Sequence, residues 1–377
     1  MKTASFRVWA DRPYKGVRHL SISALLFALA AATGDPKFDE LTLYQDWIVG
    51  CDNLRSCHAT SLPVEEEGDI GPVGDGNMTV AIKRGAAPSD GPQVQLAVVN
   101  DLPRSTMTDI QGVAVDGGKS LLKLNGTNGV FNLDVKASAK LVAAVRHARV
   151  IALVNHQGKV VASASLSGLM AALAYIDERQ YRLDTVSALA KPGRKVADYR
   201  TIPPMVPQSP INIREIPDRL PSGLDEAQIS SLNQQDPCLA DNPNAAPAAP
   251  EYHRMDDRTS LLILPTSCGG YNPYSQIYTI SDDGVIAKAQ FARHPGGDTL
   301  DDTDLVNIWW DKEERRLNSF GRGRVLSDCG VSEEFAWSEG RFHLTHYASM
   351  SPCRGSRDFI TTYRRETVSR PVRNKTE

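Results

Sequence analysis

The sequence predicts a mainly β protein of the α+β class, with antiparallel sheets, a few short helices and two regions stapled by disulfides. Three observations support this fold class. Segments of alternating apolar and polar residues recur between Gly, Pro and Asp turns, which is the pattern of half-buried strands. Only a few segments carry apolar residues at helical spacing. Six cysteines, an even number, follow an apolar leader.

The chain of 377 residues is long enough for two domains. Composition and proline density divide it into successive parts. We expect an N-terminal β-rich region with two helices at 38–199, a Pro-rich linker at 200–222, a C-terminal antiparallel β region at 223–368 and a basic tail at 369–377.

Residues 1–32 are typical of a signal peptide. Five basic side chains precede the apolar stretch "LSISALLFALAAA", and Ala30 and Ala32 fit an A-x-A cleavage site. An uncleaved membrane anchor is the alternative, although this stretch is shorter than the ~20 apolar residues that span a bilayer. A cytosolic start is the other alternative. Cleavage is favoured, and it predicts a periplasmic or secreted protein with no membrane span after cleavage.

Charge argues against a nucleic-acid partner. Residues 1–32 hold five basic and one acidic side chain, so their removal changes 42 basic against 45 acidic residues to 37 against 44, a net charge of −7. Such a chain lacks the basic surface that binds phosphate backbones. The basic tail after Cys353 is typical of a solvated chain end, and docking onto an anionic surface is the alternative.

The cysteines are predicted to be disulfide-bonded, because export favours oxidation. None belongs to a C-x-x-C pair, which argues against redox catalysis and zinc binding. Six cysteines allow fifteen connectivities, and neighbours in sequence favour 51–57, 238–268 and 329–353. The cysteines are Cys51, Cys57, Cys238, Cys268, Cys329 and Cys353. Asp52 and Asn53 are turn residues, so a hairpin closed by the first pair is expected.

In the first region, strands are predicted at 77–84 and 94–100, and a hairpin with an "NHQG" turn at 151–168. Two helices are predicted at 138–148 and 167–183. Ser167 is expected to cap the second helix, and Glu178 is expected to pair with Arg182 at its end.

In the second region, the proline-rich stretch 201–221 is followed by a short predicted helix at 221–233. Three hairpins are then expected. They lie at 280–291 with an Asp-Asp-Gly turn, at 307–323, and at 333–349 with a bend at Ser338-Glu339-Gly340.

The chain resembles a six-cysteine family of secreted proteins from Gram-negative bacteria, the domain of unknown function 1176. Four stretches carry the resemblance: "DWIVGCDNLRSCHA", "SLSGLMAALAYIDERQYRLDTVSALAKPG", "SCGGYN" and "GRGRVLSDCGVSEEFAWSEGRFHLTHYASMSPCRG". The first region is also loosely similar to the invasion-associated locus B family. The resemblance implies a secreted or periplasmic location and no assigned activity. The chain departs from the family pattern "DERQGR" at Tyr181, and it has "VLSDCG" where the family tends to have "GLGDCG".

Each group of candidate metal-binding or catalytic residues also has an interpretation that involves no ligand and no reaction, and the sequence favours that interpretation. His343 and His346 could share a metal on a helix, but the surrounding pattern predicts a strand, where they face opposite sides. The acidic loop 294–304 does not have the spacing of a calcium loop. Asp177 and Glu178 are helix neighbours and do not face one substrate. The glycines around Arg324 lack the strand-and-helix context of a phosphate loop.

No cofactor, no metal site and no catalytic residue is therefore predicted. One possible binding surface is predicted. Trp309 and Trp310 are adjacent in a predicted strand and must face opposite ways, so one is expected in the core and one on the surface. The exposed one, with Tyr271 and Tyr274, is predicted to mark a binding surface.

The leading hypothesis is an exported, non-enzymatic binding or envelope-associated module whose partner is an envelope protein, a peptide or a glycan. The alternative is a periplasmic hydrolase that uses carboxylates which the sequence does not pair. A polar cleft that collects Asp, Glu, His or Arg from both regions would favour the enzyme, and a flat surface with exposed aromatic residues would favour the binder.

Overall fold

The computed structural model describes most of the chain after residue 40. The described ranges are 41–63, 77–99, 102–124, 128–198, 200, 208–216, 219–235, 249–266, 269–292 and 305–370. All of them belong to one compact unit that begins at Pro36. The predicted leader 1–32, the pair Cys238 and Cys268, and the predicted acidic loop 294–304 lie outside the described residues.

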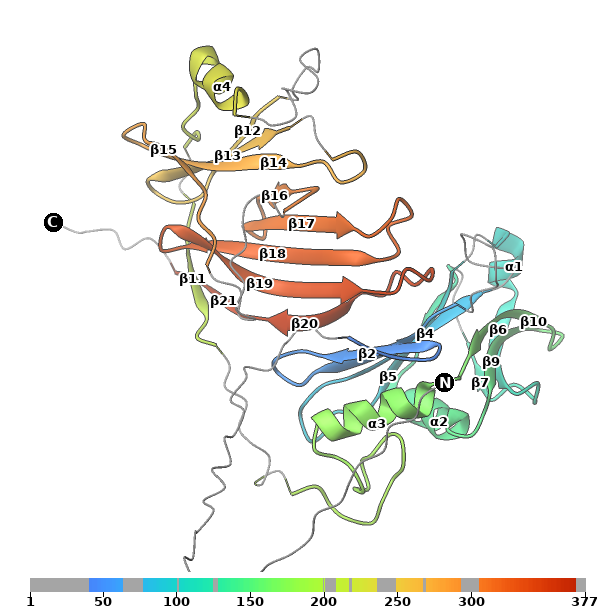
Figure 1. The fold of residues 1–377 in the computed structure, drawn as a ribbon. Coiled ribbons are helices and arrows are strands. Elements are labelled where there is room, and N and C mark those ends of the chain that lie inside the picture. Colours follow the sequence, from blue (N-terminus) through green and yellow to red (C-terminus); the bar gives the residue numbers. More distant parts are fainter. Residues whose placement is uncertain are drawn as a thin grey trace, which may run out of the picture. The chain divides into compact units, whose positions relative to one another are not determined.

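The first region contains two antiparallel sheets, shown in blue to green in Figure 1. The six-stranded sheet has the order β1 (Thr42–Tyr44), β2 (Trp47–Cys51), β3 (Cys57–Ser61), β4 (Met78–Arg84), β5 (Gln93–Val98), β8 (Val130–Asn132). The four-stranded sheet has the order β10 (Val160–Ser165), β9 (Val150–Asn155), β6 (Ile110–Val115), β7 (Leu122–Lys123). The helices are α1 (Arg104–Thr108), α2 (Val135–Val145) and α3 (Leu169–Arg179).

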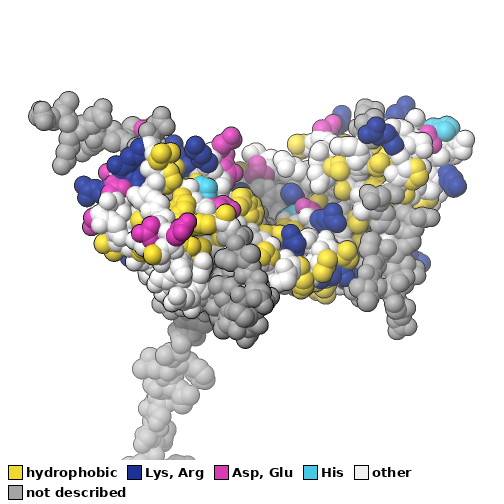
Figure 2. All heavy atoms as spheres, turned by 90° about the horizontal axis from the view of Figure 1, so that it is seen from above, with side chains coloured by type: hydrophobic (Ala, Val, Ile, Leu, Met, Phe, Trp, Pro, Cys, Tyr) yellow, Lys and Arg dark blue, Asp and Glu magenta, His cyan; other side chains and the backbone are white. Residues whose placement is uncertain are grey.

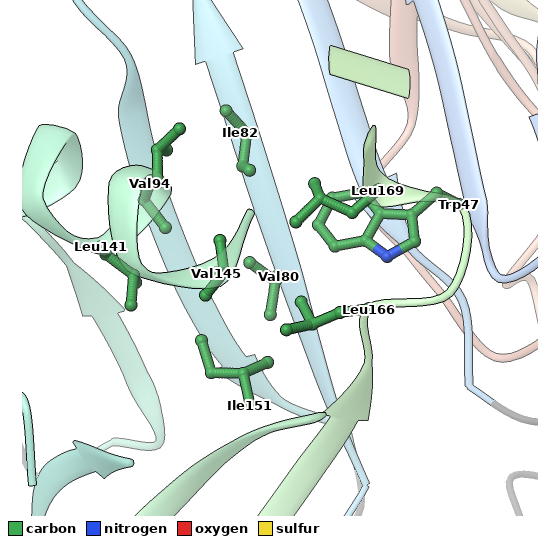
Figure 3. Close-up of a pocket in the computed structure, with 10 residues that line it drawn as sticks. Trp47, Val80, Ile82, Val94, Leu141, Val145, Ile151, Leu166 and Leu169 are labelled. Carbon is green, nitrogen blue, oxygen red and sulfur yellow. The ribbon is translucent and has the colours of Figure 1, made fainter. Parts of the chain in front are cut away.

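The apolar core of this region lies on one face of the six-stranded sheet. Alternate residues of each strand point into it, as strand geometry requires, and α2, α3 and the second sheet close it. Figure 3 shows the packing of α2 side chains against β4 and β5. The gap among them has a volume of about 10 Å³, and every lining residue is apolar. A gap this small and without polar partners is a packing defect rather than a ligand site.

The residues that cap α2 and α3 explain where these helices start, and one predicted cap is wrong. Asp134 caps α2 by accepting a hydrogen bond from the Ala137 N–H at 2.7 Å. The predicted cap of α3 is wrong, because Gly168 occupies the N-cap and Ser167 instead donates its hydroxyl to Gln45. Gly168 is required there, since φ is +94° and a Cβ atom would lie 1.8 Å from the Tyr44 carbonyl oxygen.

The predicted ion pair at the end of α3 is also wrong. The helix ends at Arg179, and Tyr181 adopts a left-handed conformation with φ +56°. The chain therefore turns, and the Arg182 side chain is buried instead of lying on the helix surface beside Glu178. Arg182 donates to main-chain carbonyl oxygens, among them that of Ala87 at 2.7 Å.

The second region also contains antiparallel sheets, shown in yellow to red in Figure 1. One sheet comprises β12 (Glu251–Arg254), β13 (Thr259–Pro265), β14 (Ser275–Ser281) and β15 (Ile286–Lys288). The other comprises β16 (Trp309–Asp311), β17 (Arg316–Arg322), β18 (Gly330–Ser338), β19 (Arg341–Met350) and β20 (Ile360–Arg364). The three predicted hairpins are confirmed as β14–β15, β16–β17 and β18–β19, and the fold class is confirmed with them.

Two further elements lie within and just after the proline-rich stretch 201–221. Within the stretch predicted as a linker, β11 (Ile211–Arg214) pairs in parallel with β21 (Thr367–Arg370). The predicted short helix is confirmed as α4 (Glu226–Asn233). Asp225 and Gln228 form a capping box at its start.

Candidate functional site

The two regions meet between the outer face of the six-stranded sheet and strand β20. In Figure 1 the blue strand β2 lies beside the red strand β20, although they are about 300 residues apart in sequence. An apolar cluster fills the contact, and its buried members are Ile48, Leu62, Cys329, Met350 and Ile360. The disulfide Cys329–Cys353 belongs to this cluster, so it lies in the joint between the regions.

The second described disulfide, Cys51–Cys57, closes the β2–β3 hairpin beside the same joint. The predicted turn chemistry is confirmed, because Asp52 Oδ1 accepts hydrogen bonds from the Leu54 and Ser56 N–H groups at 2.9 and 2.8 Å. Asn53 exchanges two hydrogen bonds with the main chain of Arg364, at 3.0 and 2.8 Å. Asp52 Oδ2 lies 2.5 Å from the Arg364 Nε. The stapled loop therefore holds the end of β20.

Arg354 makes a second clamp across the joint. Its guanidinium pairs with Asp46 Oδ1 at 2.8 Å, and it donates to the carbonyl oxygens of Pro63 and Gln45. The Arg354 side chain is only 9% exposed, so these bonds are shielded from solvent. The apolar cluster, the stapled loop and Arg354 together fix the position of the segment 355–364.

That segment forms the wall of a polar groove. Two cavities of about 370 and 500 Å³ lie between it and the outer face of β4 and β5. Thr79 and Ala97 line the smaller cavity and are paired in register, and Lys83 and Gln93 line the larger cavity and are also paired. Thr79 and Lys83 are four residues apart on β4, so the groove is at least ~13 Å long. Figure 2 shows Lys and Arg side chains beside a hollow in the face seen there.

A cluster of His58, Lys83 and Asp358 lies where the two cavities meet. The His58 Nε2 is 2.7 Å from Asp358 Oδ2, and the Lys83 Nζ is 3.4 Å from the other carboxylate oxygen. Burial lowers the pKa of His58 despite the hydrogen bond and charge of Asp358. Burial alone would raise the pKa of Asp358, but the His58 hydrogen bond and the Lys83 charge hold it below its usual value. A neutral His58 therefore donates Nε2–H to an ionised Asp358.

The smaller cavity contains a second fixed pair. Arg324 binds both oxygens of Asp328, at 2.7 and 2.5 Å, and the Gly355 N–H donates to the same carboxylate at 2.6 Å. Burial raises the pKa of Asp328, but these hydrogen bonds outweigh it and the pKa lies below its usual value. Gly323 lies just before this pair, and packing against the disulfide leaves no room there for a side chain. A Cβ atom on Gly323 would lie 2.7 Å from Cys329 Sγ.

Arg357 differs from the other charged residues that line the groove. Its side chain is exposed and lines the smaller cavity. Among the residues that the structure describes, Arg357 has no hydrogen-bond or ion-pair partner. It is therefore a guanidinium that a ligand can bind without displacing a protein group.

A buried charge network lies beneath the larger cavity. Asp177 binds Arg84 Nη2 at 2.7 Å and accepts hydrogen bonds from the Leu189 and Ala190 N–H groups. Gln180 accepts a hydrogen bond from Arg84 Nε. Both charged side chains are almost completely inaccessible, so Asp177 has a structural environment and no open face for a substrate.

The aromatic residues of the predicted binding surface lie away from the groove. Trp310 is buried and Trp309 is 47% exposed, so the prediction that they face opposite ways is confirmed. Tyr271 and Tyr274 are also exposed, but no contact recorded for the described residues joins either ring to Trp309. The three exposed aromatic residues remain a predicted binding surface. None of them lines the groove cavities.

The two predicted histidines lie on β19, as expected from the strand pattern, but the prediction that they face opposite sides is wrong. A register shift between β18 and β19 places His343 opposite Ala336 and His346 opposite Glu334, so both histidines are on one face. The His343 ring lies 3.2 Å from the Ser338 carbonyl oxygen, and the His346 Nε2 lies 2.9 Å from Thr361 Oγ1. Within the described ranges, no group of three or more His, Cys, Asp or Glu side chains is placed to hold a metal ion. No helix in those ranges is both long and apolar enough to cross a membrane.

Comparison with known proteins identifies a family of unknown function and an uncharacterized relative. A family model described as "Protein of unknown function (DUF1176)" matches residues 42–366. The uncharacterized protein YpfG of Escherichia coli (strain K12) is 28% identical over 199 residues, which are 50% of this chain and 55% of that protein. The chain thus spans about half the length of this relative. A crystal structure of invasion associated protein b from Bartonella henselae matches with a TM-score of 0.27 and 17% identity, covering 38% of this chain and 99% of that one.

Proposed function

The chain belongs to the DUF1176 family of proteins of unknown function, and we propose that it is an exported binding protein of the bacterial envelope. Its ligand would be a polar molecule held in the groove between β4–β5 and the segment 355–364. The resemblance predicted from the sequence supports export and is confirmed at the level of the family. The two described disulfides fit an oxidising compartment.

One observation carries the proposal. The groove has the volume of a ligand pocket, and most of its charged groups are already held in fixed pairs by the fold. Fixed polar groups bind a ligand with little loss of conformational entropy. Arg357 and the partly exposed Lys83 leave donors for an acidic or hydroxyl group of the ligand.

Filling the groove tests this function. Gln95 lies on the groove floor, so Gln95→Trp should block the smaller cavity. The matched control is Gln111→Trp, which adds the same bulk at an exposed strand position of β6. Each protein would be incubated with a small-molecule extract of the envelope and examined by native mass spectrometry.

We expect a bound mass on the wild type and on Gln111→Trp that is absent from Gln95→Trp. Equal retention by all three proteins would reject the groove as the ligand site. Export is tested separately by cell fractionation, with the mature N-terminus expected after residue 32. A mature protein that stays in the cytosol would reject the location.

A hydrolase is the second candidate, and the His58–Asp358 pair is the observation that favours it. Such a pair holds an imidazole in one tautomer, which is how a general base is oriented in hydrolases. Groove residues come from both regions, which is the arrangement expected of the enzyme. Turnover of peptidoglycan fragments that is lost in His58→Gln, while binding is kept, would establish the enzyme in place of the binder.

A further inference from the structure

A line of five residues crosses the outer face of the five-stranded sheet. Directly paired residues of antiparallel strands point to the same face. The register pairs Trp309 with Asn318, Asn318 with Glu334, Glu334 with His346, and His346 with Arg364. The five side chains therefore share one face, on β16 to β20 in order. With a strand spacing of ~4.8 Å the line is ~19 Å long. We call it the cross-strand row.

The cross-strand row leads into the groove. Arg364 is its last member and also lines the larger cavity. A register shift in the β19–β20 pairing leaves Thr362 without a direct partner, which brings Thr361 to the same face as Arg364. Thr361 lines the larger cavity and contacts His346 of the row. The groove and the row are thus one continuous polar surface.

The charges of the cross-strand row are balanced within the protein. Glu334 lies 3.6 Å from His346 and close enough to Arg316 for its charge to raise the pKa of that guanidinium against the lowering by burial, and Arg364 is paired with Asp52. Burial lowers the pKa of His346 although Glu334 raises it, so the imidazole is neutral at neutral pH. Asn318 is buried and donates to the Arg316 carbonyl oxygen. What remains for a ligand is the partly exposed Glu334 and His346, with little net charge around them, and the exposed Trp309 indole at the far end.

We propose that the cross-strand row binds an oligosaccharide chain that continues into the groove. The inference rests on the proposed binding function and names its ligand class. Sugar hydroxyls match a neutral array of donors and acceptors, and an exposed indole is a flat apolar platform for a sugar ring. An extended peptide is held differently, by main-chain hydrogen bonds at a free strand edge. The row lies on a sheet face, so it favours the glycan.

Titration with defined sugars tests the proposal. Chitohexaose, cellohexaose and maltohexaose would be titrated into the mature protein by calorimetry. At least one should bind, and Trp309→Ala should weaken that binding at least tenfold, because a stacked aromatic anchor is typically worth more than 1.4 kcal/mol. Tyr271→Ala is the control, since Tyr271 is similarly exposed and lies outside the row. Thermal unfolding of each variant confirms that it is folded.

The outcomes separate this inference from the proposed function. If no hexasaccharide binds the wild type, or if Trp309→Ala binds as tightly as the wild type, the row is not a glycan site. Equal losses in Tyr271→Ala and Trp309→Ala would also overturn the assignment to the row. The groove function fails separately, if Gln95→Trp retains the envelope ligand. Binding of acidic or extended peptides in place of all three sugars would identify a peptide site and reject the glycan.

Discussion

The charge network beneath the groove and the charged pairs inside it use the same residue types, but they differ in burial. Arg84 and Asp177 are at most 1% exposed, and main-chain N–H groups complete the binding of the carboxylate. In the groove, Lys83 is 48% and Asp358 20% exposed. A buried charge must have its partner, whereas a half-exposed one can exchange its partner for a ligand. Burial therefore separates the structural ion pair from the one available for binding.

The largest effect is expected when the buried ion pair of Arg84 and Asp177 is broken. Asp177→Asn leaves Arg84 buried beside a neutral group, so we expect a loss of about 3–5 kcal/mol in the free energy of unfolding. Asp358→Asn keeps an acceptor for His58 in a partly exposed site and should cost about 1–2 kcal/mol. Urea denaturation of both variants measures the difference. Equal losses would show that burial does not distinguish the two sites.

The next largest effect is expected at the joint, because the Arg354 side chain is only 9% exposed and holds the segment that forms the groove wall. Arg354→Met removes the pairing with Asp46 and the bonds to Pro63, and it should cost about 2–3 kcal/mol. Arg258→Met is the control, since the Arg258 side chain is 85% exposed and should cost close to nothing. A neutral result for Arg354→Met would mean that the joint is held by its apolar cluster alone.

Acid should lower the free energy of unfolding through protonation of His58. The folded pKa of His58 is lowered below the unfolded value of about 6.5, so the unfolded chain binds the proton more readily. The contribution of neutral His58 is complete above that value and is lost as the pH falls through the folded pKa. The wild type should therefore lose more stability than His58→Gln between pH 7.5 and pH 5. Parallel losses in urea midpoints would contradict this. The other histidines are present in both proteins, so the comparison isolates His58.

The smallest effect concerns backbone conformation at the two departures from the family pattern. Ser327 and Tyr181 both have positive φ, +56° in each case, where the family tends to have glycine. Ser327→Gly should stabilise by about 0.5–1 kcal/mol, because glycine adopts this conformation without steric cost. Tyr181→Gly should gain less, since Arg55 lies over the Tyr181 ring at 5.0 Å and that contact would be lost. Thermal melts that rank the variants in the reverse order would reject this explanation.

The local features of this fold could be predicted from sequence, and the site could not. Turn residues and apolar periodicity located the hairpins β14–β15, β16–β17 and β18–β19, because these signals act between neighbours in the chain. The pair His58 and Asp358 is 300 residues apart, and no spacing rule joins such positions. The pairing of Glu178 with Arg182 failed for a related reason. Tertiary contacts with main-chain carbonyls took Arg182 out of the helix, which intrahelical spacing does not foresee.

The position of β20 has a consequence for how the protein matures. The core of the first region is assembled from residues 47–190, but its outer face has no groove until the segment 355–364 is in place. That segment belongs to the second region, which follows the first in the sequence. The first region can therefore bury its core before the wall of the groove is in place. Under the export and binding proposed above, a ligand that needs both walls of the groove is held only once the second region has been translocated and has docked onto the first.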